Sequence, residues 1–548
     1  MSPAATEARV AAPATGLPAA GRFTVVATDK VKTAALQALR DDERFEVLTV
    51  EGGDELREAL RRAHGLIVRS ATQVDRDLLD GAPELRVVGR AGVGVDNIDL
   101  AAATERGVAV LNAPAGNTVS AAELTLALIL ATVRKVAEAD RSVRSGEWVR
   151  SRFGGIELRG KTLGLVGAGR IGSEVGRRAR AFGMDVVAHD PYLTDERADD
   201  LGFERVSFEE VLERSDVVSL HVPLTAQTRG LLDARTLRTM KPSAFLVNVA
   251  RGGVVDEAAL VEALEEGVIA GAALDVFEEE PLQEDSPLRR APNLVLTPHL
   301  GASTSEAQEL VAGEIAEAVR AALAEGDLSR ALNAPAIGSE ALRRLQPILK
   351  LGRTLGRLGC VLAPGGILGV DVRYAGEFPD APGPLASNVL MGLLGNILGD
   401  DQVNFVNAPH LAEVRGIGVS THRLARRTDY TEFVELVVRA ERGETRVAGA
   451  LLGERHARLV RVDDYHVDVE PQGSLLVLRN RDVPGVIGRV GTLLGEMEVN
   501  IAEYHQARLS QGGEALAAVA VDGTVSPAMV SRLREVPEIL DAWVVELG

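Results

Sequence analysis

The sequence predicts an α/β protein with two doubly wound lobes, followed by a mixed α/β segment and a small βαββαβ domain. Three observations lead to this prediction. Short apolar strands alternate with helical segments from Phe23 to about residue 330, and a glycine-rich turn joins a strand to a helix within residues 162–190. From Ser474 onward, strands and helices follow one another in the order βαββαβ. Alternation of this kind is typical of parallel sheets covered by helices.

The composition is that of a folded, multidomain protein. The chain has 548 residues, 46% of them hydrophobic, which corresponds to roughly three to four domains. The formal net charge is −19, with acidic and basic residues interspersed, which argues against nucleic acid as a partner. The single cysteine, Cys360, allows neither an intrachain disulfide nor a thiolate metal cluster. We therefore expect no metal site and a cytoplasmic location.

Two segments have no predicted catalytic role. Residues 1–21 are rich in Ala and Pro and are expected to form a disordered extension. Within a long helix expected at residues 118–145, the apolar stretch 121–136 contains three charged side chains. It is too polar for a membrane span and is predicted to be a buried helix, so no membrane association is expected.

The segment GKTLGLVGAGRIG predicts a dinucleotide site in a Rossmann-like lobe. A β run at residues 162–166 leads into Gly167, Gly169 and Gly172, and a helical stretch follows. The first glycine allows a tight turn, the second lets a pyrophosphate approach the backbone, and the third lets the helix pack on the strand. Asp190 ends the next strand about twenty residues later, where a carboxylate binds the ribose 2′-hydroxyl and repels a 2′-phosphate. NAD is therefore favoured over NADP.

Three residues downstream suit the oxidation of a 2-hydroxy acid. Arg251, in NVARGG, offers a planar cation for a substrate carboxylate. His299, in TPHLGAST, offers an imidazole that accepts the hydroxyl proton. Glu280, in DVFEEEP, would hydrogen-bond the ring and stabilise its imidazolium form. Together they predict an acid–base and carboxylate-binding set placed between the two lobes.

The motifs VRSAT, GRAGVGVDNID, GNTVSAAEL, NVARGGVVDE and PHLGAST carry a family resemblance. The chain resembles the D-isomer-specific 2-hydroxy-acid dehydrogenases, and its layout resembles their long form, which acts on 3-phosphoglycerate. The resemblance implies a substrate-binding lobe at 22–116 and 301–330, an NAD-binding Rossmann domain at 117–300, an intervening domain at 331–472 and an ACT domain at 473–548.

Further site residues follow from the resemblance, position by position. The cofactor contacts that it implies are Val93, Gly167, Gly169, Arg170, Ile171, Gly172, Asp190, Ala250, Asp275 and Gly301, with Asp275 facing the nicotinamide amide. The substrate contacts that it implies are Arg69, Ser70, Asn117, Arg150, Arg152 and Arg251. A phosphate monoester carries nearly two negative charges, which is why Arg150 and Arg152 are included, as residues that reach across from a partner subunit or as a solvated basic loop.

The ACT-like domain implies a regulatory site. Residues Asn480, Asp482 and Asn500 occupy the first turn and the start of the second strand, where such domains hold L-serine between paired subunits. At Asn480 the family pattern has a His or Tyr donor, so this sequence departs from it. A homodimer or homotetramer is expected, because a site shared between subunits needs two chains.

The predicted activity is NAD-dependent oxidation of 3-phospho-D-glycerate to 3-phosphohydroxypyruvate, the first step of L-serine biosynthesis, with feedback by serine. A C-terminal module that has lost ligand binding and serves assembly only stays possible within this prediction, and two alternatives to the predicted activity remain open at this stage. One is another D-2-hydroxy-acid dehydrogenase, acting on glycerate, hydroxypyruvate or 2-hydroxyglutarate. The other is an NADH-binding regulatory scaffold, which the intact catalytic trio argues against.

Overall fold

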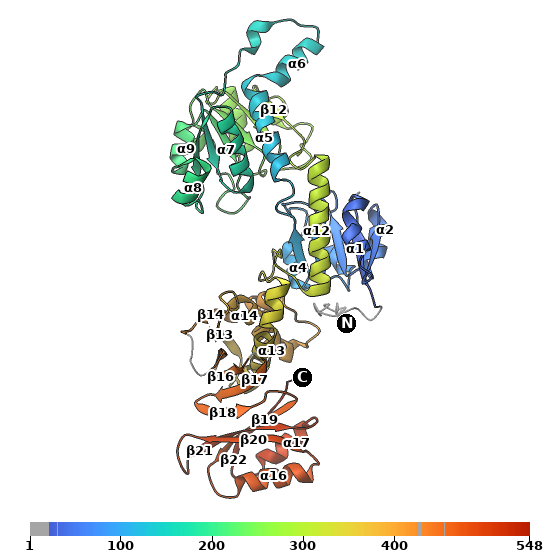
Figure 1. Cartoon of the computed structure of the whole chain (residues 1–548), viewed down its shortest axis with the longest axis vertical. Helices are drawn as coiled ribbons and strands as arrows, with labels where there is room; N and C mark the ends of the chain where they lie inside the picture. The colour runs from blue at the N-terminus through green and yellow to red at the C-terminus, as the bar shows by residue number, and fades with distance from the viewer. Residues whose placement is uncertain (1–20, 30, 426–429, 454, 548) are drawn as a thin grey trace, which may run out of the picture. The chain divides into compact units, whose positions relative to one another are not determined.

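The computed structural model describes residues 21–29, 31–425, 430–453 and 455–547. The expected extension lies outside these ranges, apart from Gly21. The chain forms two compact units, one from Ala113–Glu314 and the other from Met1–Asn112 together with Ile315–Gly548. Some of their elements are labelled in Figure 1. The domain boundaries expected from the sequence stay predictions.

The unit Ala113–Glu314 contains a seven-stranded parallel sheet in the order β12-β11-β10-β9-β6-β7-β8. Its strands are β6 (Thr162–Val166), β7 (Asp185–His189), β8 (Glu204–Arg205), β9 (Val217–Leu220), β10 (Phe245–Asn248), β11 (Gly271–Leu274) and β12 (Leu294–Leu296). The strands β9, β10 and β11 are buried throughout, as apolar strands covered on both faces must be. The strand order reverses between β6 and β9, which is where such sheets bind ligands.

The helices of this unit are α5 (Thr118–Val133), α6 (Val136–Arg144), α7 (Arg170–Ala181), α8 (Asp195–Leu201), α9 (Phe208–Arg214), α10 (Ala234–Leu237) and α11 (Glu257–Glu265), with 3-10 turns η2 (Arg150–Phe153) and η3 (Pro287–Arg289). The single helix predicted at residues 118–145 is wrong. Lys135 adopts a left-handed conformation with φ 54°, which ends α5 and starts α6 in a new direction. The buried helix predicted at 121–136 therefore stops at Val133, and Val136 is 53% exposed.

The first lobe of the other unit has a five-stranded parallel sheet in the order β2-β1-β3-β4-β5. Its elements are β1 (Phe23–Ala27), η1 (Thr33–Leu36), α1 (Gln37–Arg40), β2 (Phe45–Thr49), α2 (Gly53–Leu60), β3 (Gly65–Val68), α3 (Arg76–Asp80), β4 (Val87–Arg90), α4 (Leu100–Glu105) and β5 (Ala109–Asn112). These elements follow the predicted alternation of strands and helices. Two doubly wound sheets are therefore present, as the sequence predicts.

The long helix α12 (Ser305–Glu325) returns to this lobe, as expected. Glycines in the sheet make room for it, because a Cβ at Gly89 would lie 2.6 Å from the side chain of Val319 and 2.8 Å from that of Ile315. The chain after α12 then closes the edge of the lobe. Asn333 Oδ1 accepts the backbone N–H of Val110 at 2.9 Å, and its Nδ2 donates to the carbonyl oxygen of Val108 at 2.9 Å.

The next part of the chain is a mixed α/β domain with a six-stranded sheet in the order β14-β13-β15-β16-β17-β18. Its elements are α13 (Ser339–Leu362), β13 (Ile367–Ala375), α14 (Pro382–Leu398), α15 (Ala408–Val414), β14 (Gly418–Arg423), β15 (Glu432–Ala440), β16 (Gly443–Leu452), β17 (His456–Val462) and β18 (Tyr465–Val469). A buried side chain ties it to the first lobe, because Asn404 Nδ2 donates to the carbonyl oxygen of Gly107 at 3.0 Å.

The last domain confirms the predicted βαββαβ order. Its elements are β19 (Ser474–Arg481), α16 (Val486–Glu496), β20 (Ile501–Arg508), β21 (Glu514–Val521), α17 (Pro527–Arg534) and β22 (Ile539–Glu546). The antiparallel sheet has the order β20-β21-β19-β22, and one core joins it to both helices. This is the ferredoxin-like arrangement.

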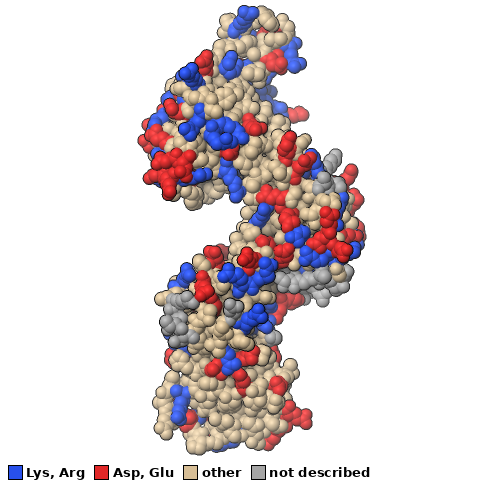
Figure 2. Space-filling view, in the orientation of Figure 1, with Lys and Arg blue, Asp and Glu red and all other residues tan. Residues whose placement is uncertain are grey.

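Two surface properties bear on partners. Among the described residues, no helix combines the length and the apolar character that crossing a membrane requires. On the face shown in Figure 2, basic and acidic side chains lie among one another in both units. This mixing agrees with the interspersed charges of the sequence.

Candidate active site

The turn between β6 and α7 has the geometry of a dinucleotide loop. Gly167 has φ 96°, and a Cβ there would lie 2.4 Å from the carbonyl oxygen of His221. A Cβ at Gly172 would lie 2.2 Å from the carbonyl oxygen of Gly167, whereas one at Gly169 would meet no atom within 4 Å. Packing therefore requires the first and third glycines. The second leaves open space at the N-terminus of α7, which fits a pyrophosphate.

Asp190 follows β7, which ends one residue earlier than predicted, and the loop itself holds its carboxylate. Oδ2 accepts the backbone N–H of Ala168 at 2.9 Å, and Oδ1 accepts that of Tyr192 at 2.8 Å. A carboxylate has about four acceptor positions, so acceptor capacity remains for ribose hydroxyls. The predicted contacts Arg170 and Ile171 are the first residues of α7, exposed and partly buried respectively.

The predicted acid–base pair is formed. His299 Nδ1 lies 2.6 Å from Glu280 Oε2, and the other oxygen of Glu280 accepts the backbone N–H of Phe277 at 3.1 Å. An ionised carboxylate only accepts hydrogen bonds, so Nδ1 donates and the neutral ring keeps its lone pair on Nε2. Burial opposes ionisation of Glu280, but hydrogen bonds from His299 and the Phe277 N–H hold its pKa below the ordinary value.

Asp275, fully buried after β11, shapes the turn that presents His299. Its Oδ1 accepts the hydroxyl of Thr297 at 2.6 Å and the N–H of Leu300 at 2.8 Å, and its Oδ2 accepts the N–H of Gly301 at 2.9 Å. The backbone of His299 is left-handed, with φ 54°. Burial raises the pKa of Asp275, and these hydrogen bonds favour its ionised form. The predicted contact of Asp275 with the nicotinamide stays a prediction.

The loop that carries Arg251 is held by Asn248, the last residue of β10. The buried Asn248 side chain donates to the carbonyl oxygen of Arg251 at 2.9 Å and accepts the N–H of Ala250 at 3.0 Å. Arg251 Nη1 donates to the carbonyl oxygen of Ala250 at 2.6 Å. The loop also packs tightly, since a Cβ at Gly252 would lie 1.7 Å from the carbonyl oxygen of Phe277.

One unit thus supplies all three residues of the predicted catalytic trio. Arg251, Glu280 and His299 follow three adjacent strands of one parallel sheet, β10, β11 and β12. The positive charge of Arg251 also acts on Glu280 and favours its ionised form. The arrangement places a cation, an acceptor nitrogen and an ionised carboxylate together, which suits proton removal next to a bound carboxylate.

Three predicted substrate contacts lie in the same unit as the trio. Asn117 precedes α5, and its buried Oδ1 accepts no hydrogen bond from the residues that the structure describes. Arg150 and Arg152 lie exposed in η2. Arg152 Nη1 pairs with Glu147 Oε2 at 3.0 Å, and the guanidinium of Arg150 lies 5.9 Å from the ring centre of Trp148.

Three further residues predicted to contact the substrate or the cofactor, Arg69, Ser70 and Val93, lie in the first lobe. Arg69 follows β3, and backbone hydrogen bonds to Asp29 and from Asn97 fix its position. Ser70 is exposed, and Val93 is partly buried after β4. Their roles stay predictions.

Of the predicted effector residues, Asn480 and Asp482 lie at the C-terminal end of β19. Asn500 precedes β20 at the opposite end of the sheet, where Ile501 and Ser474 both pair with Val521. Asp482 Oδ2 pairs with Arg508 Nη1 at 3.0 Å, and Asn500 Nδ2 donates to Asp522 Oδ2 at 2.6 Å. Asn480 differs from them, because it is only 1% exposed and donates to the carbonyl oxygen of Arg481. Asp482 and Asn500 are therefore better placed for an incoming ligand than Asn480.

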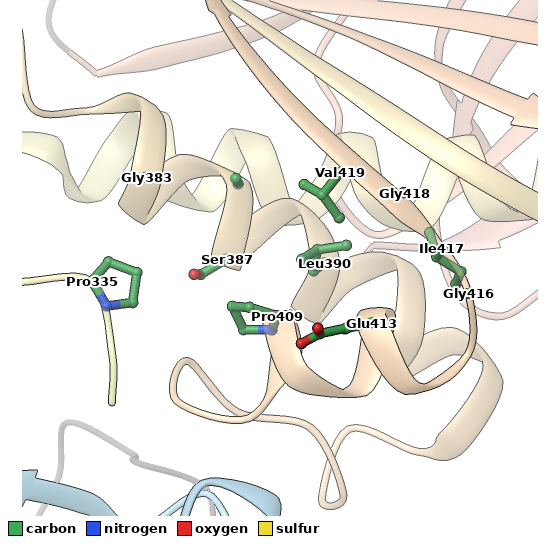
Figure 3. A pocket seen from close by; sticks show the side chains of 11 residues that line it. Pro335, Gly383, Ser387, Leu390, Pro409, Glu413, Gly416, Ile417, Gly418 and Val419 are labelled. Carbon is green, nitrogen blue, oxygen red and sulfur yellow. The ribbon is translucent and has the colours of Figure 1, made fainter. Parts of the chain in front are cut away.

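A cavity of about 560 Å³ lies in the mixed α/β domain, between α14, α15 and the start of β14 (Figure 3). Its lining is mainly apolar, including Leu390, Ile417 and Val419, and Ser387 and Glu413 are its polar side chains. None of the predicted site residues lines this cavity. The cavity is therefore separate from the predicted catalytic residues.

Comparison with known proteins identifies two domains of the chain. Residues 126–301 match the family model described as D-isomer specific 2-hydroxyacid dehydrogenase, NAD binding domain, and residues 344–463 match D-3-phosphoglycerate dehydrogenase intervening domain. The chain therefore carries an NAD-binding domain, which confirms the predicted cofactor.

Similar proteins cover nearly the whole chain. The D-3-phosphoglycerate dehydrogenase of Methanocaldococcus jannaschii is 40% identical over 95% of this chain and 99% of its own. That of Bacillus subtilis is 40% identical over 96% of this chain and 100% of its own. The TT0316 protein from Thermus thermophilus, known from a crystal structure, is 41% identical, with a TM-score of 0.50, and the match covers 56% of this chain and 97% of that protein.

Proposed function

Because this chain belongs to the D-3-phosphoglycerate dehydrogenases, within the D-isomer-specific 2-hydroxyacid dehydrogenases, we propose that it oxidises 3-phospho-D-glycerate to 3-phosphohydroxypyruvate. This reaction opens L-serine biosynthesis. The observation that carries the proposal is the 2.6 Å contact between His299 and Glu280, held beside the loop of Arg251.

Each catalytic side chain has one task. Arg251 binds the C1 carboxylate through its forked N–H groups and stays charged at every working pH. His299 accepts the hydroxyl proton on Nε2, and Glu280 stabilises the resulting imidazolium. The chemistry that bound NAD supplies is acceptance of the hydride from C2. In the reverse direction His299 returns the proton.

The substrate phosphate needs further positive charge. Arg150 and Arg152 are proposed for this task, because they lie exposed in one short turn. Asn117 is proposed as a polar contact, because its Oδ1 is a buried acceptor without a partner among the described residues.

The test compares NADH formation from NAD with D-3-phosphoglycerate, D-glycerate and D-2-hydroxyglutarate, while the keto product is trapped. We expect kcat/KM to be highest for the phosphorylated acid, because only that acid engages the basic residues. A preference for an unphosphorylated acid would contradict the proposed substrate. Binding of NADH without turnover of any acid would favour the regulatory scaffold.

Asp190 is expected to set the preference for NAD over NADP. Asp190→Ala should lower kcat/KM for NAD by about 10- to 100-fold, because hydrogen bonds to a charged group contribute roughly 1.5–3 kcal/mol. The substitution should also reduce the preference for NAD over NADP, since the carboxylate that repels the 2′-phosphate of NADP is lost. Steady-state kinetics with both cofactors measure this. Asp185→Ala, at the exposed start of β7, is the matched control, and an unchanged preference in Asp190→Ala would contradict the role.

Serine is proposed as an effector held between paired subunits by Asp482, which follows β19, and by Asn500, which precedes β20 at the opposite end of the sheet. A ligand that binds the native state raises the melting temperature by mass action, so serine at a hundredfold excess over its Kd should stabilise by about 2.7 kcal/mol. Thermal melts with L-serine, with D-serine as the control, measure this. Equal melting curves for Asp482→Ala with and without L-serine are expected, and a full shift in that variant would place the site elsewhere.

A homodimer or homotetramer and a cytoplasmic location complete the proposal. The segment 136–153 exposes four large apolar side chains, Val136 at 53%, Val143 at 54%, Trp148 at 74% and Val149 at 40%. Apolar groups gathered on one exposed segment favour contact with a second chain. The single cysteine suits a reducing compartment. Sedimentation equilibrium gives the number of subunits.

A further inference from the structure

Glu257 contacts the loop that carries Glu280. It is the last residue of the segment NVARGGVVDE, which also contains Arg251, and it begins helix α11. Its Oε1 accepts the backbone N–H of Glu278 at 2.6 Å. Glu278 lies only two residues before Glu280, so this hydrogen bond restrains the backbone from which the Glu280 side chain extends.

The two segments meet at a second point. A Cβ at Gly252 would lie 1.7 Å from the carbonyl oxygen of Phe277, so the chain beside Arg251 lies directly against the Glu280 loop. Glu257 and Gly252, both in the NVARGGVVDE segment, thus contact the Glu280 loop at Glu278 and Phe277. Within the loop, the carboxylate of Glu280 accepts the N–H of Phe277. The relative position of Arg251 and Glu280 depends on both contacts.

Glu257 also contributes charge. It is partly buried, and burial raises its pKa, with further increases from the neighbouring carboxylates. The charged and titratable groups around this part of the site are Asp256, Asp275, Glu278, Glu280, His299 and Arg251. A negative charge at Glu257 therefore adds to that of Glu280, the carboxylate that contacts His299.

We propose that Glu257 is a positioning residue for the dehydrogenase reaction, which fixes the Glu280 loop and adds negative charge next to the carboxylate that contacts His299. The proposal rests on the proposed function, because the proton acceptor is the one named there. Glu257, the last residue of the NVARGGVVDE motif, would thus act on His299 through Glu280.

Two substitutions separate position from charge. Glu257→Gln keeps an oxygen that accepts the Glu278 N–H and removes the charge, whereas Glu257→Ala removes both. Glu265→Gln, on the exposed side of α11, removes a charge from the same helix and is the matched control. For each variant, kcat, KM and kcat/KM are measured from pH 5 to 10, together with the melting temperature and NADH binding.

The expected results differ between the variants. Glu257→Ala should lower kcat by about 10- to 100-fold, since misplacing a catalytic group by about 1 Å has an effect of this size. Glu257→Gln should recover most of that loss. It should also move the acid limb of kcat/KM to lower pH by about half a unit, because the base is then easier to deprotonate. Glu265→Gln should leave the profile unmoved.

Other outcomes would overturn the inference. A lower melting temperature with unchanged kcat in Glu257→Ala would show a structural role alone. An acid limb that stays in place in Glu257→Gln would remove the electrostatic part of the proposal. Absence of turnover in the wild-type chain, despite NADH binding, would refute the proposed function itself, and is recognised before any variant is compared.

Discussion

Replacing His299 with alanine is expected to lower kcat by about two to four orders of magnitude, the usual contribution of acid–base catalysis. The reason is geometric, because Glu280 occupies Nδ1 and leaves Nε2 as the nitrogen that accepts the hydroxyl proton. NADH binding should change little, since His299 belongs to the turn after β12 and the glycine loop to the turn after β6. Single-turnover measurements of NADH formation test this.

The control for this experiment is His456→Ala, an exposed histidine at the start of β17 in another domain. It should keep normal turnover. The role of His299 would be refuted by a His299→Ala enzyme whose kcat is within a fewfold of the wild type. The kcat of Glu280→Gln should lie between that of His299→Ala and that of the wild type, because a neutral amide still orients the ring but stabilises its charge less.

Replacing Arg251 with alanine is expected to raise KM for the hydroxy acid about 100-fold or more and to lower kcat as well. Two charge-assisted hydrogen bonds to the carboxylate are lost, each contributing roughly 1.5–3 kcal/mol. The remaining substrate is also less well oriented toward His299, so kcat falls. Steady-state kinetics with D-3-phosphoglycerate measure both constants.

Arg251→Lys sharpens the test, because it keeps the charge and loses the planar fork. A partial recovery of KM is expected, since an ammonium contacts the carboxylate at a single point. Arg235→Ala, which replaces an exposed arginine of helix α10, is the matched control. An Arg251→Ala enzyme with normal affinity for the acid would refute the carboxylate-binding role.

Most of the fold was predictable because its strands are short apolar runs with turn residues at their ends. The glycine loop, the parallel sheets and the βαββαβ domain follow from local pattern. The break between α5 and α6 was missed, because Arg134 and Lys135 have ordinary helix propensity and nothing in the pattern signals a left-handed residue. Tertiary packing decides such a position.

The site was predictable to the same extent. Arg251, Glu280 and His299 were predicted from the chemistry that their residue types supply, and their catalytic roles stay predictions. Asn248 and Glu257 were not predicted, because each acts on backbone N–H or C=O groups whose position depends on how the chain turns. Asn248 is the first residue of the NVARGGVVDE motif and Glu257 is its last. A polar side chain at either end of a predicted catalytic loop is the sequence signal that could have identified them.

The hydrogen bonds of Asn333 bear on how the chain folds during synthesis. Residues up to Asn112 leave the ribosome first, yet Val110 finds its side-chain acceptor 223 residues later, and Leu111 pairs with Ala331. The edge strand β5 therefore stays open until the whole of Ala113–Glu314 has been made. An open edge invites pairing with other chains. We expect the first lobe to become protease-resistant during translation only after the unit Ala113–Glu314 has been made, although the sequence of the lobe comes first.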